Sequence, residues 1–353
     1  MRALLGVLIA ALIGVGIWVN GSLTYPMNAL SEPVRVEIPK GMGGKQIVGL
    51  LHERGIVRRP DLVYWYLRYE GALQQVEAGT HEIPPGLSAV ELAVAITRPA
   101  AAQEVTLTLI PGESVWEAAQ RIEAAGLGRA SELISRAANR DYVIKTLGLP
   151  AGPARPRRPD GVRQTYLEGF LYPETHRFDP NASLDEVVER VVAQFKGRWA
   201  KLLQRRRSDY LAIRQLTKLT DHELITLASL VEEETSLASE APKIAGVFYN
   251  RLAKGMPLQT DPTLMYSPER VGKTPTPRER KDSTNPYNTY SSAGALPPGP
   301  ICSPRVNALV AVLAPERHDL LFFVARRDGQ RGHVFSRTYK EHKAHVRAQL
   351  GGP

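Results

Sequence analysis

Residues 220–236, TDHELITLASLVEEETS, combine an apolar helical pattern with three consecutive glutamates. Asp221 suits the N-cap position, and apolar residues then recur at helical spacing: Leu224, Leu227, Ala228, Leu230 and Val231. Because successive side chains turn by about 100° around a helix, Glu234 lies roughly 50–70° from the centre of the apolar stripe, Glu232 roughly 90–110° and Glu233 roughly 150–170°. The stretch therefore predicts a helix on which Glu234 lies nearest the core, Glu232 flanks it and Glu233 faces solvent.

Glu234 is the candidate acid and base of this stretch. Partial burial raises the pKa of a carboxyl group, because the charged form loses solvation, and a raised pKa suits a general acid at neutral pH. A glutamate at the edge of a core is more often a structural residue bonded to the backbone. The helical pattern alone leaves both roles open.

Three polar, turn-rich segments favour a binding cleft: residues 167–178 (LEGFLYPETHRF), 250–266 (NRLAKGMPLQTDPTLMY) and 285–301 (NPYNTYSSAGALPPGPI). Amide, hydroxyl and aromatic groups together suit a sugar, because rings stack on its apolar face and amides bond its hydroxyl groups. The candidate substrate-binding residues are Glu168, Gln259, Asp261, Tyr287, Asn288, Thr289 and Tyr290.

The sequence lacks the patterns of several other chemistries. The eight histidines show no metal-ligand spacing, Cys302 is the one cysteine, and no G-x-S-x-G elbow, P-loop or dinucleotide fingerprint is present. We therefore expect neither a metal nor a cofactor.

The formal net charge of +9 favours an anionic partner. Residues 196–218 carry eight Lys or Arg side chains against one acidic residue, Asp209. A solvated basic helix face is the simplest interpretation. No aromatic-interleaved or zinc-finger pattern accompanies the charges, so we do not expect nucleic acid binding.

The N-terminal residues 3–19, ALLGVLIAALIGVGIWV, contain no polar side chain, and as a helix they would span roughly 25 Å. A cleaved signal peptide is the alternative, but no small-x-small cleavage pattern follows directly, and Trp18 suits a membrane interface. We expect an uncleaved transmembrane anchor at residues 1–20 and a linker at 21–33.

The rest of the chain predicts an α+β fold. Residues 34–98 read as a small module of β-α-α-β-α type, 99–165 as a connecting α+β segment with a Pro/Arg-rich loop at 150–163, and 166–350 as a mixed α/β domain. Residues 34–57 and 105–128 form a partial repeat of strand, turn and helix. They are either two related modules or two common units of this kind. Leu320 to Ala325 and His333 to Ser336 predict a hairpin.

The motifs LEGFLYPETHRF, ASLVEEETSLASEAPKIAGVFYNRL, LQTDPTLMY, NPYNTY and LPPGPICSP, in this order, resemble the endolytic murein transglycosylase family, membrane proteins with a YceG-like domain. The resemblance covers most of the chain and implies a LysM-like module at residues 34–98 and a catalytic domain at 166–350. The family's catalytic glutamate directly precedes Thr in its V-E-x-E-T motif, which places that role on Glu234, before Thr235. The segment SSAGA is one residue longer than usual, and the 150–163 loop is peculiar to this chain.

The resemblance implies lytic cleavage of the bond between N-acetylmuramic acid and N-acetylglucosamine, which leaves a 1,6-anhydromuramyl end. It further implies a single-pass protein of the inner membrane with a periplasmic catalytic domain, acting on peptidoglycan strands beside peptidoglycan synthases. The alternative is a non-catalytic, membrane-tethered scaffold that binds the cell wall.

Overall fold

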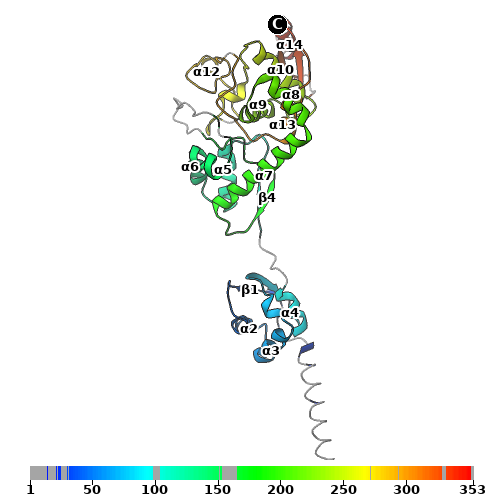
Figure 1. Cartoon of the computed structure of the whole chain (residues 1–353). Helices are drawn as coiled ribbons and strands as arrows, with labels where there is room; N and C mark the ends of the chain where they lie inside the picture. The colour runs from blue at the N-terminus through cyan, green and yellow to red at the C-terminus, as the bar shows by residue number, and fades with distance from the viewer. Residues whose placement is uncertain are drawn as a thin grey trace, which may run out of the picture. The chain divides into compact units, whose positions relative to one another are not determined.

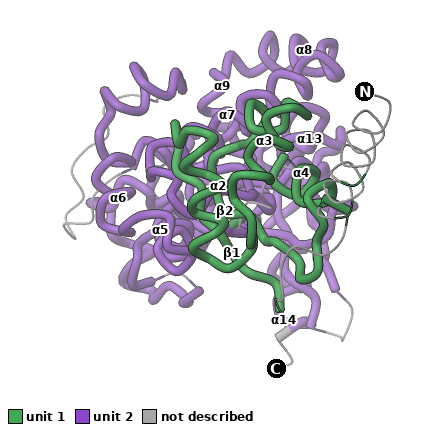
Figure 2. The backbone as a smooth tube through the Cα atoms, turned by 90° about the horizontal axis from the view of Figure 1, so that it is seen from below, with its two compact units in different colours: residues 1–104 green, residues 105–353 purple. Residues whose placement is uncertain are grey.

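The computed structural model describes residues 32–97, 104–150, 165–270, 272–292, 294–327 and 331–350, with Gly14, Gly21, Leu23, Thr24, Leu30 and Gly152. The chain divides into two compact units, Met1–Glu104 and Val105–Pro353, and each has its own hydrophobic core (Figures 1 and 2). The expected transmembrane segment, residues 3–19, lies outside the described residues apart from Gly14. No helix among the described residues is long and apolar enough to span a bilayer.

The smaller unit has the element order β-α-α-β-α that its sequence predicts. Its elements are β1 (Val34–Ile38), α2 (Gly44–Glu53), α3 (Pro60–Tyr69), the short 3₁₀ helix η1 (Ala72–Gln74), β2 (Gly79–Ile83) and α4 (Ala89–Thr97). β1 pairs antiparallel with β2, from Val34 opposite Ile83 to Ile38 opposite Gly79. Alternate residues of each strand point into the core, as the period of two requires.

The larger unit begins with the same order of elements. These are β3 (Val105–Thr108), α5 (Val115–Ala124), α6 (Ala130–Ala138), the π-helical turn η2 (Tyr142–Thr146), β4 (Thr175–Phe178) and α7 (Leu184–Arg205). β3 pairs antiparallel with β4, from Val105 opposite Phe178 to Thr108 opposite Thr175. The repeat that the sequence shows over one strand and one helix thus extends to five elements.

Local interactions recur between the two copies. Gly41 and Gly112, in the turn after the first strand, have φ angles of +83° and +85°, which L side chains rarely adopt. His81 and His176 occupy the middle of the second strand, and the Nε2 of each lies 2.8 and 3.1 Å from the carbonyl oxygen of the residue four positions earlier. Ser88 and Ser183 precede the last helix of each copy, and each pairs with a glutamate three residues later. These recurrences favour two related modules.

The remaining elements of the larger unit build around one central helix. They are α8 (Arg207–Thr217), α9 (Asp221–Glu234), α10 (Ala241–Ala253), α11 (Asp261–Leu264), α12 (Pro277–Arg280), α13 (Val306–Leu313), β5 (Phe322–Ala325), β6 (His333–Ser336) and α14 (Tyr339–Leu350). α9 packs against α10 and α13 (Figure 1). It is buried nearly all round, because every residue from His222 to Glu232 except Glu223 lies inside.

Three details refine the sequence-based expectations. The N-cap of α9 is Thr220 rather than Asp221: the Thr220 hydroxyl accepts a hydrogen bond from the Glu223 N–H. The segment expected to connect two domains, residues 99–165, supplies core side chains of the larger unit from Leu107 onward. The predicted hairpin is confirmed, with Ala325 opposite His333.

Candidate functional site

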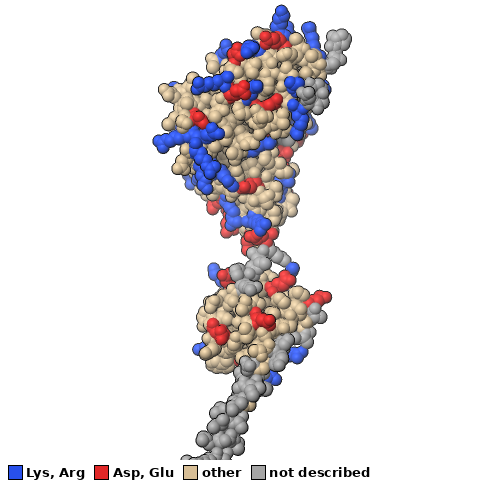
Figure 3. All heavy atoms as spheres, turned by 90° about the vertical axis from the view of Figure 1, so that its right-hand side faces the viewer, with Lys and Arg blue, Asp and Glu red and all other residues tan. Residues whose placement is uncertain are grey.

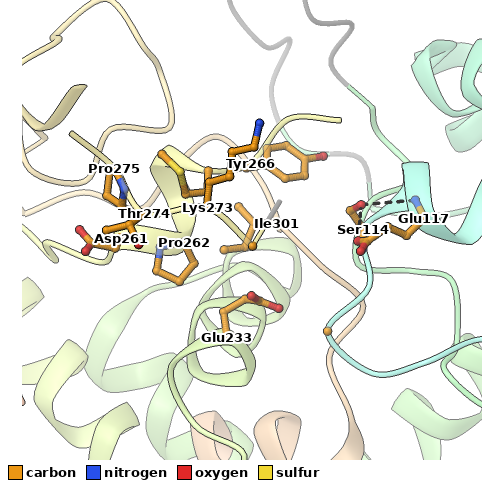
Figure 4. Close-up of a pocket in the computed structure, with 13 residues that line it drawn as sticks. Ser114, Glu117, Glu233, Asp261, Pro262, Tyr266, Lys273, Thr274, Pro275 and Ile301 are labelled. Atoms are coloured by element: carbon orange, nitrogen blue, oxygen red, sulfur yellow. Dashed lines mark hydrogen bonds between the residues drawn. The ribbon is translucent and has the colours of Figure 1, made fainter. Parts of the chain in front are cut away.

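A pocket of about 230 Å³ lies in the larger unit beside the end of α9. Its wall combines the β3–α5 turn, Glu233, the α11 region and the loop after it: Gly112, Ser114, Glu117, Glu233, Asp261, Pro262, Met265, Tyr266, Gly272, Lys273, Thr274, Pro275 and Ile301. Figure 4 shows Ser114 and Glu117 on one side, Asp261 on the other, and Glu233 between them. Segments more than 150 positions apart in the sequence therefore meet at this pocket.

Residues 301–303 form hydrogen bonds with both α9 and the β3–α5 turn. The Ile301 N–H donates to the Ser229 hydroxyl at 3.1 Å, and the Cys302 thiol donates to the Ser229 carbonyl at 3.4 Å. Gly112 and Ser303 meet through a backbone hydrogen bond of 3.0 Å, which Gly112 donates. These contacts fix the turn of the second module beside the glutamates of α9.

Glu232 is a structural residue. Its side chain is 2% exposed, and it accepts hydrogen bonds from Arg305 Nε at 2.6 Å and from the Arg305 backbone N–H at 3.2 Å. Burial raises the pKa of the Glu232 carboxyl, and the Arg305 guanidinium opposes that rise. The pair ties the end of α9 to Arg305, the N-cap residue of α13.

Glu233 is exposed and lines the pocket. Protein atoms nevertheless surround most of its carboxyl group. That burial raises the pKa of Glu233 to about 7; the Cys302 thiol opposes the rise, and the charge of Glu232 adds to it. Gly112 is what leaves room for the carboxyl group, because a Cβ there would lie 3.1 Å from Glu233 Oε1.

Glu234 occupies the last position of α9 and is partly exposed. Burial of its carboxyl group raises its pKa, and the Thr260 hydroxyl is the largest opposing influence. The Thr260 Oγ1 is buried and has no hydrogen-bond partner in the part of the chain that the structure describes. The charges of His333 and Arg251 also favour the Glu234 carboxylate, whereas the charge of Asp261 disfavours it.

Asp261 is the predicted binding residue that lines the pocket directly. Arg280 donates to its two oxygens from Nε at 3.1 Å and from Nη2 at 2.7 Å, and the Tyr290 hydroxyl donates at 2.5 Å. Burial and this bond to Asp261 raise the pKa of Tyr290 to about 12. Asp261 and Tyr290 are thus brought together, with the carboxylate held by a bidentate Arg fork.

Glu168 is fully buried and lies outside the pocket lining. Its carboxylate accepts the Val115 N–H at 3.1 and 3.0 Å, at the first residue of α5, and the Tyr266 hydroxyl at 2.8 Å. A carboxylate at a helix N-terminus satisfies a free N–H and meets the positive end of the helix dipole. Because Tyr266 lines the pocket, Glu168 orients one wall of it.

The other predicted binding residues support loops around the pocket. Tyr287, Asn288 and Thr289 are fully buried. The Asn288 amide donates to three carbonyls of the α12 region at 2.7 to 3.3 Å, and the Thr289 hydroxyl accepts the Thr260 N–H at 3.0 Å. Gln259 is exposed and has a φ of +52°. We therefore see Asp261 at the pocket surface and these residues behind or beside it.

The sequence reasoning did not single out several residues of the site: Gly112, Ser114, Glu117, Tyr266, Arg280 and Arg305. The repeat already marks the Gly112–Ser114 turn, but nothing local in the sequence relates it to α9. Across the described residues, no group of three or more His, Cys, Asp or Glu side chains has a metal-binding arrangement.

The chain is similar to proteins named endolytic murein transglycosylase and to a solved structure of a yceG-like protein. The endolytic murein transglycosylase of Bacillus subtilis (strain 168) is 29% identical over 343 residues, which cover 94% of this chain and 89% of that protein. The Streptococcus pneumoniae (strain D39) protein of the same name is 26% identical over 333 residues, and the match spans 58% of its length. A crystal structure of the yceG-like protein lmo1499 from Listeria monocytogenes has a TM-score of 0.57 and 27% identity, covering 89% of this chain and 99% of that one.

One protein-family match covers both compact units of the chain. The model of the YceG-like family matches residues 36–348, from β1 of the smaller unit to α14 of the larger one. The chain therefore belongs to the YceG-like family.

Proposed function

We propose that this protein is an endolytic peptidoglycan lytic transglycosylase with Glu234 as its single acid and base. The observation that carries the proposal is the surroundings of Glu234. Burial raises the pKa of Glu234, and the neighbouring Thr260 hydroxyl has no hydrogen-bond partner among the described residues. Glu234 does not line the pocket itself, but it directly follows the pocket residue Glu233 in the chain. Relatives named endolytic murein transglycosylase, at 26–29% identity, supply the substrate class.

The reaction needs one carboxyl group because the substrate supplies the nucleophile. Protonated Glu234 gives its proton to the oxygen between N-acetylmuramic acid and N-acetylglucosamine, and the C1–O bond breaks. The Glu234 carboxylate then takes the proton of the muramyl C6 hydroxyl, while O6 bonds to C1 and closes the 1,6-anhydro ring. Glu234 ends protonated again, so the step is balanced without water or a metal.

The neighbours of Glu234 suit both halves of this cycle. Burial and the Asp261 charge favour the protonated acid, whereas Thr260, His333 and Arg251 stabilise the carboxylate formed after proton transfer. The Arg280 fork holds the Asp261 carboxylate at the pocket wall, where it can stabilise positive charge developing on the sugar ring. Of the binding set, we assign contact with substrate to Asp261 and support of the pocket to Glu168, Tyr287, Asn288 and Thr289.

We also propose a cellular setting on the basis of the sequence. We propose that residues 3–19 anchor the chain in the inner membrane, that the β-α-α-β-α unit is LysM-like, and that the catalytic unit works in the periplasm on strands from peptidoglycan synthases. The apolar run and the family match support this setting.

The proposal is tested by digesting purified peptidoglycan with the full chain and its Glu234→Gln variant, followed by mass spectrometry of the muropeptides. We expect anhydromuramyl ends from the parent protein and a loss of about 10² to 10⁴-fold in rate for the variant. Glu233→Gln is the matched control, because Glu232→Gln would also break the ion pair with Arg305. Unchanged anhydro ends from Glu234→Gln would refute the assignment, and a loss confined to Glu233→Gln would move the acid to Glu233.

The same assay separates the enzyme from a binding scaffold. A scaffold would retain peptidoglycan binding in a sedimentation assay and would release no new chain ends with any variant. The enzyme forms anhydro ends, and Glu234→Gln should bind the polymer as well as the parent chain while cutting it poorly.

A further inference from the structure

Arg251, on α10, is a buried cation of the larger unit. Lys and Arg side chains usually stay in water, and Figure 3 shows them standing out from the surface of this unit. Arg251 is 6% exposed, and it is the one buried Lys or Arg among the residues that the structure describes. Its hydrogen bonds within that part of the chain run to carbonyl and amide oxygens and to no carboxylate. A buried charge without a paired carboxylate is costly, so this position needs a functional explanation.

The Arg251 guanidinium joins the α10–α11 loop, residues 254–260, to the segment before β5. Its Nη1 donates to the Leu258 carbonyl at 2.7 Å and to the Pro257 carbonyl at 3.3 Å, and lies 3.5 Å from Gln259 Oε1. Its Nε donates to the Leu321 carbonyl at 2.6 Å. Three consecutive residues of the loop therefore meet one side chain.

The α10–α11 loop needs such support because of its backbone. Gln259 has a φ of +52°, a conformation that residues with a Cβ rarely adopt and that neighbouring groups must hold in place. The Gln259 N–H donates to the Thr289 carbonyl at 3.1 Å, and the Thr260 N–H donates to the Thr289 hydroxyl at 3.0 Å. Arg251 thus bonds the carbonyls directly before the strained residue, and Thr289 bonds the N–H groups from that residue onward.

The loop leads into two residues that surround Glu234. Burial raises the pKa of Glu234, the Thr260 hydroxyl is the largest opposing influence, and the Arg251 charge opposes the rise as well. Asp261, the first residue of α11, follows Thr260 and lines the pocket. Burial lowers the pKa of Arg251, and the charge of Glu234 opposes this decrease. Arg251 and Glu234 therefore lie within electrostatic reach of each other without forming an ion pair.

We infer that Arg251 is a positioning residue of the active site, whose guanidinium holds the α10–α11 loop so that Thr260 and Asp261 keep their places around Glu234. The inference rests on the proposed function, because it takes Glu234 as the acid and base. Arginine suits this task because its planar guanidinium presents several N–H donors in a fixed arrangement and stays protonated. A lysine would supply the charge without this arrangement. A merely structural tie would affect stability and leave the chemistry of Glu234 unchanged.

The variants Arg251→Lys and Arg251→Met of the full chain separate position from charge. Each digests purified glycan strands between pH 5 and pH 9, and the rate of anhydromuramyl end formation is measured. Arg251→Lys keeps a positive charge but loses the planar donor set, so kcat should fall by up to about 10²-fold, with the basic limb of the pH profile near that of the parent protein.

Arg251→Met removes the charge as well. Glu234 should then stay protonated to higher pH, so the basic limb of the pH profile should move to higher pH. The other ionisable groups whose charges interact with Glu234 are His333, Asp261 and Glu233, and all three remain in every variant. A difference between the profiles of the two variants therefore reports the charge at position 251.

Hydrogen exchange followed by mass spectrometry measures the loop without any need for activity. The Gln259 and Thr260 amides should exchange about 10-fold faster in Arg251→Lys, because the loop loses hydrogen bonds from a charged donor, while the amides of α9 stay protected. Arg214→Met is the matched control. Arg214, on α8, also donates to a backbone carbonyl, that of Leu219 at 2.6 Å. Its loss should leave kcat, the pH profile and the exchange of the α10–α11 loop unchanged.

The outcomes are distinct. Parent-like kcat and loop exchange in Arg251→Lys would overturn the positioning role, and coincident pH profiles of Arg251→Met and the parent protein would overturn the role of the charge. Circular dichroism verifies folding, and Arg251→Gln, which keeps an amide donor, replaces Arg251→Met if that variant unfolds. A parent protein that forms no anhydromuramyl ends would instead refute the proposed function, and the exchange rates alone would then decide whether Arg251 holds the loop.

Discussion

Three adjacent carboxyl groups at the end of α9 differ because each meets a different neighbour. Glu232 bonds the Arg305 guanidinium, the pKa of Glu233 is influenced by Cys302 at the pocket, and the pKa of Glu234 is influenced by Thr260. Burial raises the pKa of all three, but only the surroundings decide whether that serves structure or chemistry. Glu232 is tied to a cation, so it is the least suited of the three to exchange a proton with a substrate.

The raised pKa of Glu233 should make stability depend on pH. A glutamate in the unfolded chain has a pKa of about 4.3, and Glu233 in the folded protein has a pKa of about 7. Between these two pH values the native state therefore binds more protons than the unfolded state. Stability is then lost as pH rises through this window. We expect Glu233→Gln to lose less stability than the parent protein as pH rises. At pH 8 its free energy of unfolding should be about 1 kcal/mol higher than that of the parent, a value already discounted because Glu233 is exposed to solvent.

Urea unfolding at pH 5 and pH 8 measures this difference. Glu189→Gln, at an exposed position on α7, is the control and should change neither value. Parallel pH dependences for Glu233→Gln and the parent protein would show that Glu233 ionises normally in the folded state.

The helical wheel ranks Glu234 nearest the core, and that ranking is wrong: Glu232 is buried, whereas Glu234 is partly exposed. It assumes one apolar stripe, whereas α9 is buried nearly all round, so the direction away from the stripe still meets protein. Glu232 is drawn inside by Arg305, which lies 73 positions away, whereas Glu233 is exposed as predicted and also lines a pocket. Both outcomes depend on contacts that a local pattern does not contain.

At the level of elements, the contact between the end of α9 and the start of α13 depends on an ion pair that is buried at Glu232 and partly exposed at Arg305. Arg305 is the N-cap residue of α13, and its guanidinium and backbone N–H both bond the Glu232 carboxylate. Removing one partner of a buried pair leaves an uncompensated charge inside the protein, which costs more than the pair contributes.

Arg305→Met should therefore destabilise the larger unit by about 3 kcal/mol at pH 7. The loss should shrink toward pH 5, because without Arg305 the buried Glu232 carboxyl takes up a proton more readily. Thermal unfolding at the two pH values measures both effects, and Glu232→Gln/Arg305→Met should regain part of the stability. The control Arg337→Met breaks the exposed pair with Asp319 and should cost far less, because water screens that pair. An equal loss of stability in the two variants would contradict this expectation.

The sequence predicts the order of helices and strands better than it predicts which residues form the pocket. Alternation of apolar residues identifies β1, and the Asp328-Gly329 turn signal identifies the β5–β6 hairpin. The second copy of the module was visible only in its first strand and helix, because about 30 residues separate η2 from β4. That long insertion hides the correspondence of His81 with His176, although each histidine contacts the carbonyl oxygen of a residue only four positions earlier.

For the whole molecule, the division into two cores predicts two separate stabilities. The smaller core draws on β1 to α4, and the larger core begins at Leu107. Leu51→Ala empties a fully buried position of the smaller core and should cost that unit about 2–5 kcal/mol.

Hydrogen exchange followed by mass spectrometry assigns that loss to a unit. Amides of residues 34–97 should exchange faster in Leu51→Ala, while those of α9 stay protected. Leu230→Ala, at a fully buried position of α9, is the reciprocal control and should affect the larger unit alone. Faster exchange of both units in either variant would mean that they unfold together.

The pocket is a property of the larger unit as a whole, because no single stretch of the chain contains all of its lining residues. It needs Ser114 from the second module, Glu233 from α9 and Asp261 from α11. Sequence patterns locate such segments one by one, and their meeting depends on the packing of the larger unit as a whole. Family resemblance is what links Glu234 to a reaction before the structure is known.

The central claim, that Glu234 transfers a proton so that the sugar's own C6 hydroxyl closes the ring, is tested most directly by digesting glycan strands in ¹⁸O-labelled water. We expect anhydromuramyl ends that carry no ¹⁸O, and we expect these ends to disappear with Glu234→Gln. Reducing ends that carry ¹⁸O would show that water is the nucleophile, and would contradict this claim.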